Sequence, residues 1–452
     1  MNTWFEQALF YHIYALGFCG TPATNDFYSQ PVSRLDKVGD WLDHIQDLGL
    51  NAIYLGPLFE STSHGYDTAD YYTVDRRLGT NADLANLSRE MHARGMHLIL
   101  DGVFNHVGRD FWAFKDVIEK GESSRYKDWF SNLCFGQASP YNDPFSYESW
   151  NGHFNLVKLN LDNPEVKDHL FNAVAMWIRE FGIDGLRLDT ADCLNMQFMR
   201  ELSAFCRGIR PDFWMMGEVI HGDYRQWVNP KSLDSVTNYE AFKGLYSSHN
   251  DGNYFEIAFS LNRQFGDGGI YKGLSLYSFA DNHDVDRVAS TLKDSTHLQP
   301  LYTILFTKPG IPSIYYGSEW GITGSKEKGG DAALRPELDL AGFQDSPGNE
   351  NLAPWIKSLI DLRKRSEALR SGKYHQVFVD HNQFAFARYV TDEVVLVCVN
   401  SDKKPVIIHL DLKPFFGKQL IDMQDSEMSC PVDNGSCTVT LAPNCGRIFK
   451  LE

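Results

Sequence analysis

A regular alternation of two kinds of segment constrains this chain most, from its start to about residue 370. Short apolar runs typical of buried strands alternate with longer segments whose apolar residues recur at helical spacing. The strand candidates are residues 8–14, 52–58, 97–104, 185–188, 214–219, 235–238 (the weakest), 277–279 and 311–316. Eight parallel strands with helices between them predict a closed (β/α)8 TIM barrel, with an open doubly wound sheet as the alternative.

Two parts of the chain depart from this alternation. Residues 108–160 are rich in Asn, Ser, Gly and aromatics and show neither period, so we expect a small inserted domain after the third strand. Residues 373–452 contain short apolar runs separated by Asp, Asn, Lys and Gly, which predicts a C-terminal antiparallel β-sandwich. The predicted barrel therefore occupies residues 1–107 and 161–372.

Carboxylates stand at or just beyond the ends of three predicted strands: Asp189, Glu218 and Asp284. Any one of them taken singly is more often a helix cap or loop residue. Because the active site of such a barrel lies at the C-terminal ends of its strands, the three can converge on one point. Glycoside hydrolysis needs two carboxylates, one as nucleophile or base and one protonated as acid. Arg187 points the same way as Asp189 and would hold that carboxylate ionised.

Four ordered segments resemble the signature blocks of the α-amylase family, glycoside hydrolase family 13. They are DGVFNH at 101–106, GLRLD at 185–189, GEVIH at 217–221 and NHD at 282–284. The resemblance continues through residues 64–71, 309–317 and 331–336, so it covers essentially the whole chain. Segment 156–160 ends in Lys-Leu-Asn, which resembles the corresponding motif of cyclomaltodextrinases and neopullulanases more than that of oligo-1,6-glucosidases. A histidine at position 221 favours the same subgroup.

The resemblance implies a role for each matching residue. Asp189 matches the nucleophile, Glu218 the general acid/base and Asp284 the third carboxylate, which steadies the transition state. Tyr66 would stack on the sugar ring at the cleavage subsite. The residues expected to bind the substrate or support its binding loop are Tyr66, Asp67, His106, Arg187, His221, His283 and Arg335.

The implied activity is retaining hydrolysis of α-1,4 bonds in maltodextrins, starch fragments or cyclodextrins, through a covalent glucosyl-enzyme intermediate. Cleavage of α-1,6 bonds and transglycosylation are further activities of such sites. A 4-α-glucanotransferase or a trehalose-synthase-like isomerase is the alternative, because these enzymes share the carboxylates and differ in how well water is excluded. A non-catalytic glucan-binding or transporter-accessory protein is a third option, against which the three carboxylates argue.

Two departures limit what carries over from the family. Residues 191–193 read Ala-Asp-Cys where secreted α-amylases usually have a Lys-His pair, which puts their calcium site and part of their aglycone subsite in doubt. Asn105 alone does not make a calcium site, since Ca²⁺ takes about six to eight oxygen ligands. We therefore assign no metal-binding residues and no certain cofactor, with Ca²⁺ as the alternative, for which the sequence offers no full ligand set. We also expect no N-terminal domain of the cyclomaltodextrinase kind, so the oligomeric state does not carry over.

Composition narrows the partners and the location. A net charge of −17, from 42 Lys+Arg against 59 Asp+Glu, disfavours nucleic acid. We find neither a secretory signal nor an apolar run near the roughly 20 residues of a membrane span, and expect a cytoplasmic protein. The eight cysteines lack zinc spacing, so reduced thiols are expected, with a disulfide among Cys430, Cys437 and Cys445 as the alternative. An aromatic share of 13% suits flat, hydroxylated ligands such as sugars.

Overall fold

The computed structural model describes residues 4–326, 330–344 and 352–452. Its centre is a barrel of parallel strands: β1 (Phe10–Ile13), β2 (Ala52–Leu55), β3 (His97–Gly102), β9 (Gly185–Leu188), β10 (Trp214–Gly217), β11 (Ser235–Val236), β12 (Tyr277–Ser278) and β13 (Ile311–Tyr315). The sheet order is β11-β10-β9-β3-β2-β1-β13-β12, and a parallel bridge between Thr237 and Tyr277 joins its two ends. Each strand lies within its predicted segment, so the TIM barrel is confirmed and the open sheet is wrong.

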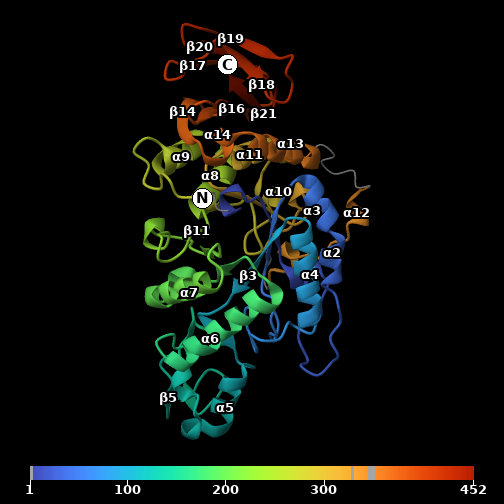
Figure 1. Cartoon of the computed structure of the whole chain (residues 1–452), viewed down its shortest axis with the longest axis vertical. Helices are drawn as coiled ribbons and strands as arrows, with labels where there is room; N and C mark the ends of the chain where they lie inside the picture. The colour runs from blue at the N-terminus through green and yellow to red at the C-terminus, as the bar shows by residue number, and fades with distance from the viewer. Residues whose placement is uncertain (1–3, 327–329, 345–351) are drawn as a thin grey trace.

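Helices surround this barrel (Figure 1). The longer ones are α3 (Leu42–Leu48), α4 (Asn81–Ala93), α6 (Pro164–Met176), α7 (Met196–Ile209), α8 (Tyr239–Asn250), α9 (Phe255–Phe265), α11 (Leu298–Thr307) and α13 (Leu352–Arg365). Shorter helices are α1 (Ala15–Phe18), α2 (Asp36–Asp40), α10 (Val288–Thr291), α12 (Ala341–Gln344) and α14 (Glu367–Ser371). The local sequence determines where several helices begin. Thr80 and Asp83 form a capping box at the start of α4, and Asn163 caps α6 ahead of Pro164.

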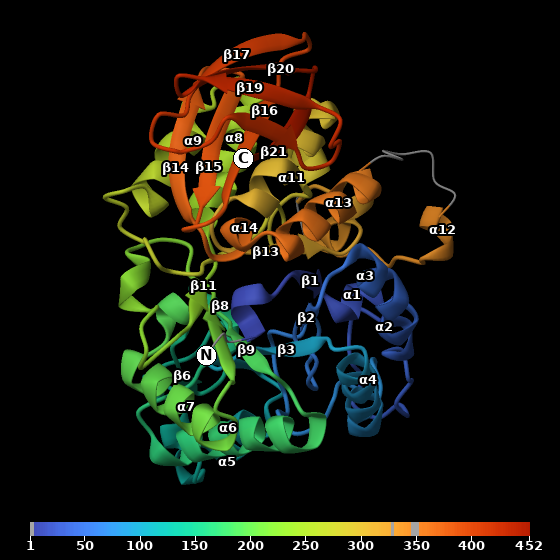
Figure 2. The same ribbon diagram turned by 45° about the horizontal axis from the view of Figure 1, so that its top comes forward.

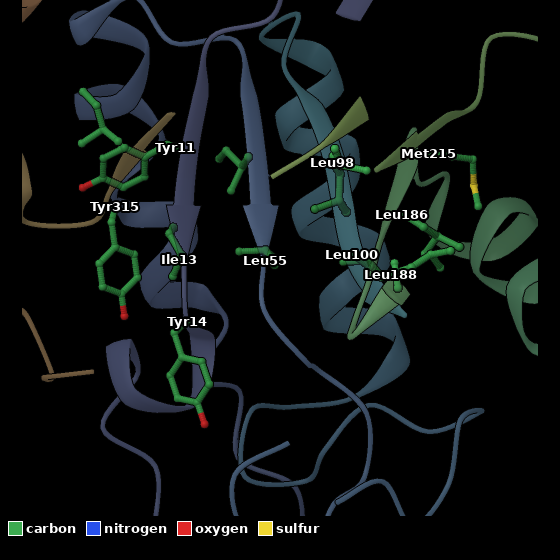
Figure 3. Packing of buried hydrophobic residues seen from close by; sticks show 14 of the residues in the cluster. Tyr11, Ile13, Tyr14, Leu55, Leu98, Leu100, Leu186, Leu188, Met215 and Tyr315 are labelled. Carbon is green, nitrogen blue, oxygen red and sulfur yellow. The ribbon is translucent and has the colours of Figure 1, made fainter. Parts of the chain in front are cut away.

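Side chains of the barrel strands alternate between the interior and the helix layer, as the period of two requires. The interior cluster includes Phe10, Tyr54, Ile99, Trp214, Met216, Tyr277 and Ile311. Ile13, Leu55, Leu100 and Leu188 belong instead to a larger hydrophobic cluster that also includes residues of the surrounding helices. Figure 3 shows these four side chains near the ends of neighbouring strands. The same alternation directs Asp101 of β3 and Arg187 of β9 into the barrel, where they lie side by side in the parallel register.

The chain between β3 and α6 forms a small insert with its own sheets. Its elements are β4 (His106–Gly108), α5 (Trp112–Lys120), β5 (Cys134–Phe135), β6 (Phe145–Ser146), β7 (Ser149–Trp150) and β8 (His153–Lys158). Strand β8 pairs with both β4 and β7, and Phe114 and Phe145 are buried beneath them. Because β4 begins at His106, the insert is anchored beside the C-terminal end of β3. Figure 1 places α5 and β5 at the end of the molecule opposite the C-terminus.

The C-terminal strands pair antiparallel in the order β14-β15-β16-β21-β18-β19-β20-β17. They are β14 (Lys373–Val379), β15 (Gln383–Tyr389), β16 (Val394–Asn400), β17 (Val406–Asp411), β18 (Gln419–Asp422), β19 (Ser429–Asp433), β20 (Ser436–Leu441) and β21 (Cys445–Leu451). Their inner residues form a separate hydrophobic cluster. The predicted sandwich is therefore confirmed, and α11, α13 and α14 lie between it and the barrel (Figure 2).

Two buried arginines fasten this sandwich and α13 to the end of α11. Arg388 of β15 donates to Thr307 O at 2.6 Å, and Arg363 of α13 donates to Phe306 O at 2.9 Å. Both guanidinium groups thus satisfy carbonyls that the end of a helix leaves without partners. Within the three described ranges, no helix is long and apolar enough to span a bilayer. All eight cysteines are free.

The N-terminal end of the barrel contains a buried carboxylate with several donors. Asp184 accepts from His92 Nε2 at 2.9 Å and from Leu98 N at 2.8 Å, and it also contacts His97 and Arg210. Burial raises the pKa of Asp184, but the hydrogen bonds from the two histidines and the backbone outweigh it and leave that pKa well below its usual range. Asp184 therefore stabilises the fold in its ionised form.

We expect Asp184→Asn to lower the free energy of unfolding by about 3 kcal/mol at pH 7, because breaking a buried ion pair leaves its partners uncompensated. A carboxyl whose folded-state pKa is lowered stabilises the protein above its unfolded pKa of about 3.9 and loses this effect as the pH falls further. The difference between wild type and variant, measured by urea denaturation, should therefore shrink below about pH 4. Asp212→Asn, which alters an exposed partner of Arg210, is the matched control; an equal loss there would contradict the prediction.

Candidate functional site

Arg187 brings together the carboxylates of three adjacent barrel strands. Its Nη1 lies 2.9 Å from Asp101 Oδ1 and 2.9 Å from Asp189 Oδ1, and its Nη2 lies 2.7 Å from Glu218 Oε2. Asp189 and Glu218 are only 5% and 8% exposed. The order β3-β9-β10 explains the arrangement, because neighbouring parallel strands end at the same edge of the barrel. One buried guanidinium therefore contacts two of the three predicted catalytic carboxylates, Asp189 and Glu218.

The backbone beyond β9 also approaches Glu218. Thr190 adopts a φ of 41°, a left-handed conformation that is unusual for a β-branched residue. In this conformation its N–H donates to Glu218 Oε2 at 3.0 Å. Strained residues of this kind cluster at functional sites. The turn thus fixes the Glu218 carboxyl beside Asp189.

Asp284 lies in the loop after β12 and is held from two sides. Its Oδ2 is 2.9 Å from His283 Nε2, and its Oδ1 is 2.7 Å from Arg335 Nη2. Arg335 also donates through Nε to His283 O at 2.9 Å and pairs with Asp331 at 2.9 Å. The predicted residues Asp284, His283 and Arg335 therefore form one connected group.

Tyr66 and Asp67 occupy the loop after β2. The Tyr66 ring is stacked on His283, with ring centroids 5.6 Å apart and planes 9° apart, and its hydroxyl contacts His283 Nε2 and Asp101 Oδ2. Asp67 is buried and accepts from Ser63 N at 3.1 Å and from Ser63 Oγ at 2.6 Å. Tyr66 therefore reaches the group of carboxylates, whereas Asp67 braces the loop that carries it.

His106 faces Asp189 from the start of β4. Its Nε2 lies 3.9 Å from Asp189 Oδ2 and has no hydrogen-bond partner among the described residues. Burial lowers the pKa of His106 to about 3, so the ring is neutral at pH 7. Trp150 of the insert lies beside it, with ring centroids 5.8 Å apart. A buried polar nitrogen without a partner is ready to bond to a ligand hydroxyl.

The structure does not bring His221 into this group. Its side chain is exposed, and in the described part of the chain it forms no hydrogen bond or ion pair. Of the other predicted residues, Asp189, Glu218, Tyr66, His283 and Arg335 are linked through Arg187 or through Asp284. His106 faces Asp189, and Asp67 braces the Tyr66 loop. His221 follows Glu218 by three residues and lies in the loop beyond the strand end, which is why its place in the sequence alone suggested proximity.

The charges at the centre of the site decide how it titrates. Burial raises the pKa of Asp189 and of Glu218, and Arg187 opposes the shift in both. Arg187 therefore offsets the burial of the two carboxyl groups only in part, and the pair loses its protons at higher pH than two free carboxyl groups do. For Asp284 burial also raises the pKa, but His283 and Arg335 outweigh it and hold that pKa far below its usual range. One proton beside ionised carboxylates is the state that acid-assisted displacement needs.

Three residues outside the predicted set contact this group. Asp101 accepts from Tyr54 Oη at 2.7 Å besides its bond to Arg187. The Tyr14 ring lies just beyond β1 (Figure 3), 4.5 Å from the Arg335 guanidinium. Tyr239, the first residue of α8, accepts from Asn282 Nδ2 at 3.2 Å. Asp101 and Tyr14 stand at or just beyond a strand end, so the pattern that indicated Asp189 also applies to them.

Nothing in this arrangement resembles a metal centre. Over residues 4–326, 330–344 and 352–452, no group of three or more His, Cys, Asp or Glu side chains is placed to hold an ion. Asn105 is buried, and its amide contacts the His106 ring. The described side chains thus provide acid–base and hydrogen-bonding chemistry.

Comparison with known proteins decides the family. The α-amylase catalytic-domain model matches residues 23–351. The chain belongs to the α-amylase family. It is 31% identical to neopullulanase 2 from Thermoactinomyces vulgaris, across 99% of this chain and 78% of that protein. It is 32% identical to a cyclomaltodextrinase from a Bacillus species, across 88% of this chain and 74% of that protein. Like other members with such names, this α-amylase-family protein is a glycoside hydrolase.

Solved structures resemble the protein over its full length. The ligand-free cyclic α-maltosyl-(1→6)-maltose hydrolase from Arthrobacter globiformis has a TM-score of 0.83 and 28% identity, with both chains covered completely. The native debranching enzyme from Nostoc punctiforme has a TM-score of 0.82 and 28% identity, covering 99% of this chain and 100% of its own. The barrel, insert and sandwich of this α-amylase-family enzyme therefore recur together in solved relatives.

Proposed function

We propose that the protein is a retaining α-glucan hydrolase that cleaves α-1,4 bonds of maltodextrins, starch fragments or cyclodextrins. The contact of one guanidinium with both Asp189 and Glu218 carries this proposal. Retaining enzymes place their two carboxyl groups closer together than inverting enzymes, which leave room for a water molecule. A shared Arg187, 2.9 Å from one carboxylate and 2.7 Å from the other, supports the closer arrangement.

In the proposed first step, Asp189 attacks the anomeric carbon while Glu218 gives its proton to the departing glycosidic oxygen. The bond between sugar and leaving group breaks as the glucosyl ester on Asp189 forms. Glu218 then takes a proton from a water molecule whose oxygen attacks the anomeric carbon. The ester bond to Asp189 breaks, the sugar is released with its new hydroxyl group, and both the Asp189 carboxylate and the Glu218 carboxyl are restored. Asp284 stabilises the positive charge that develops on the ring in both steps.

The neighbouring side chains suit a pyranose ring and its hydroxyl groups. Tyr66 offers an aromatic face, and His106 offers a free ring nitrogen beside the nucleophile. His283 and Arg335 are bound to Asp284 in this structure and can also donate to sugar hydroxyls. We therefore assign these four residues to substrate binding, with Asp67 as support for the Tyr66 loop and Arg187 as the group that sets the charge of the carboxylates. For His221, whose side chain is exposed in the loop after β10, we propose a contact with a part of the substrate that lies outside the group of carboxylates.

The relatives support α-glucans as the substrate class. The names of the Bacillus cyclomaltodextrinase and the Thermoactinomyces neopullulanase concern cyclic maltodextrins and pullulan. The Arthrobacter hydrolase has been solved with cyclic α-maltosyl-(1→6)-maltose, which contains α-1,6 bonds. We propose that this enzyme likewise accepts some α-1,6 linkages and transfers glucosyl groups to sugar acceptors.

The same comparisons and the described elements support two further assignments. One relative from Bacillus subtilis, 30% identical, is an intracellular maltogenic amylase, and we propose a cytoplasmic location here. We also propose domain boundaries at residues 107/108, 160/161 and 372/373. Strands β4 to β8 and helix α5 lie almost entirely within the second of these units, and β14 begins the last.

The stereochemistry of the first product tests the proposal directly. Hydrolysis of maltotriose or γ-cyclodextrin, followed by proton NMR within the first minutes, should give the α-anomer, because two displacements at one carbon retain configuration. Initial release of the β-anomer would overturn the retaining mechanism. Products longer than maltotriose in place of hydrolysis products would favour a glucanotransferase, and trehalose would favour an isomerase. A parallel assay with pullulan and panose measures the α-1,6 activity.

A further inference from the structure

Arg287 is a completely buried cation three residues beyond Asp284. Its exposed fraction is 0%, and it immediately precedes α10. Its guanidinium lies 4.0 Å from the centroid of the Tyr315 ring and 4.8 Å from that of Tyr316. Burying a charge is costly unless its donors are satisfied, so its partners indicate what it does.

The Arg287 donors bind atoms of two other segments. Nη1 donates to Tyr316 O at 2.5 Å and to Ser318 Oγ at 3.2 Å, beyond the end of β13. Nη2 donates to Leu334 O at 3.0 Å. The planar guanidinium thus joins the end of the last barrel strand to the segment that precedes Arg335. A lysine carries no comparable rigid fork.

Leu334 O is the carbonyl immediately before Arg335. It accepts from Tyr315 Oη at 3.0 Å as well as from Arg287. On the other side, Gly17 of α1 packs against the Arg335 backbone, where an added Cβ would lie 2.1 Å from Arg335 O. The backbone of Arg335 is therefore enclosed by α1 and by the donors to Leu334.

Arg287 is itself fixed to the segment that carries Asp284. Ser318 Oγ, its second acceptor, donates to Asp281 Oδ2 at 2.8 Å, and the N–H of Val288 donates to the same oxygen at 2.9 Å. The Arg287 N–H donates to Gly324 O at 2.9 Å. One residue therefore ties the segment around Asp284 to the segment that presents Arg335.

We propose that Arg287 is a positioning residue for catalysis, which holds Leu334 O so that the Arg335 guanidinium stays in place against Asp284. The proposal rests on the proposed role of Asp284 in the transition state. Arg335 Nη2 is 2.7 Å from Asp284 Oδ1, and an ion pair this short depends on where the Arg335 backbone lies. A shift of about 1 Å in such a group can slow a reaction by about 100-fold.

The test is a double-mutant cycle of Arg287→Lys and Arg335→Met, with kcat and KM measured on maltotriose. We expect R287K to lower kcat by about 100-fold and to change KM by less than about threefold, because the misplaced group acts in the transition state. The double variant should be no slower than R335M alone, since Arg287 acts through Arg335. Effects that multiply would overturn the proposal, as would an unchanged kcat in R287K.

Two variants separate positioning from stability. Arg363→Lys alters a similarly buried arginine that binds carbonyls far from the carboxylates, so it should lower the melting temperature but leave kcat unchanged. An equal loss of kcat in R363K would overturn the proposal. If R287K does not fold, Tyr315→Phe removes the other donor to Leu334 O and should lower kcat by about tenfold, again without adding to R335M. If Y315F lowers kcat further in the R335M background, the proposal is overturned.

Asp284→Asn distinguishes this inference from the proposed function. If D284N retains wild-type kcat, the proposed role of Asp284 fails and this inference fails with it. If D284N is inactive while the effects of R287K and R335M on kcat multiply, the proposed function stands and this inference alone is overturned. An inactive D284N with a non-additive cycle supports both.

Discussion

Replacing Asp189 with asparagine should lower kcat on maltotriose by about four orders of magnitude or more, the scale on which the loss of a covalent nucleophile is felt. An amide is a poor nucleophile, and it is neutral, so it neither forms the glucosyl ester nor balances the charge of Arg187. The carboxylate oxygen it replaces lies 2.9 Å from Arg187 Nη1. The variant remains nearly the same size, so the packing around β9 should be preserved.

Steady-state kinetics, circular dichroism and thermal melting of the same preparation check this expectation. Asp192→Asn, which changes an exposed carboxylate three residues further along the chain, serves as the matched control and should retain full activity. Near-wild-type turnover in the Asp189 variant, with an intact fold, would contradict the assignment of the nucleophile. Loss of folding in both variants would instead show that this turn cannot tolerate an amide.

The barrel could be predicted from the sequence because its signals are local. Each barrel strand is a short apolar run, and Asp189 and Glu218 directly follow two of them. The signal is weaker for strands β18, β19 and β21 of the sandwich. Pro431 interrupts β19, β18 has only four residues, and β21 includes a glycine, and each of these features weakens a strand signal.

The strand ends indicated Asp189 and Glu218, whereas Tyr66, Asp67 and Arg335 were predicted only from the resemblance to the α-amylase family. The rule that favours polar residues after a strand applied to Asp101 and Tyr14 as well, but the shared Arg187 contact depends on which strands are neighbours. Arg287 and Leu334 are separated by 47 positions along the chain, and nothing local predicts their hydrogen bond. His221 shows the converse, because closeness in sequence to Glu218 did not place it beside the carboxylates.

Replacing Glu218 with glutamine should have an effect that depends on the leaving group. Hydrolysis of maltotriose should fall by about 10³-fold, the usual scale of general acid–base catalysis, because the glycosidic oxygen then departs without a proton. α-Maltosyl fluoride needs no such proton, so its first step should be almost unaffected in the variant. The second step still lacks its general base, and the maltosyl ester on Asp189 should accumulate.

A burst of fluoride equal to the enzyme concentration, followed by slow turnover, is therefore expected in E218Q. The pH profile supplies a second measurement. Because burial raises the pKa of Glu218, against the opposing charge of Arg187, its carboxyl stays protonated to higher pH than a free glutamic acid. Wild-type kcat/KM on maltotriose should fall as the pH rises through that pKa, whereas the burst rate in E218Q should lack this alkaline limb.

Glu201→Gln, a change at a surface glutamate of α7, should alter neither measurement. If E218Q loses as much activity on α-maltosyl fluoride as on maltotriose, Glu218 does not act on the leaving group. Asp189→Asn should give neither a fluoride burst nor hydrolysis of maltotriose, because no ester can form. The two variants thus separate the residue that forms the bond to the sugar from the residue that moves the proton, although both contact the same guanidinium.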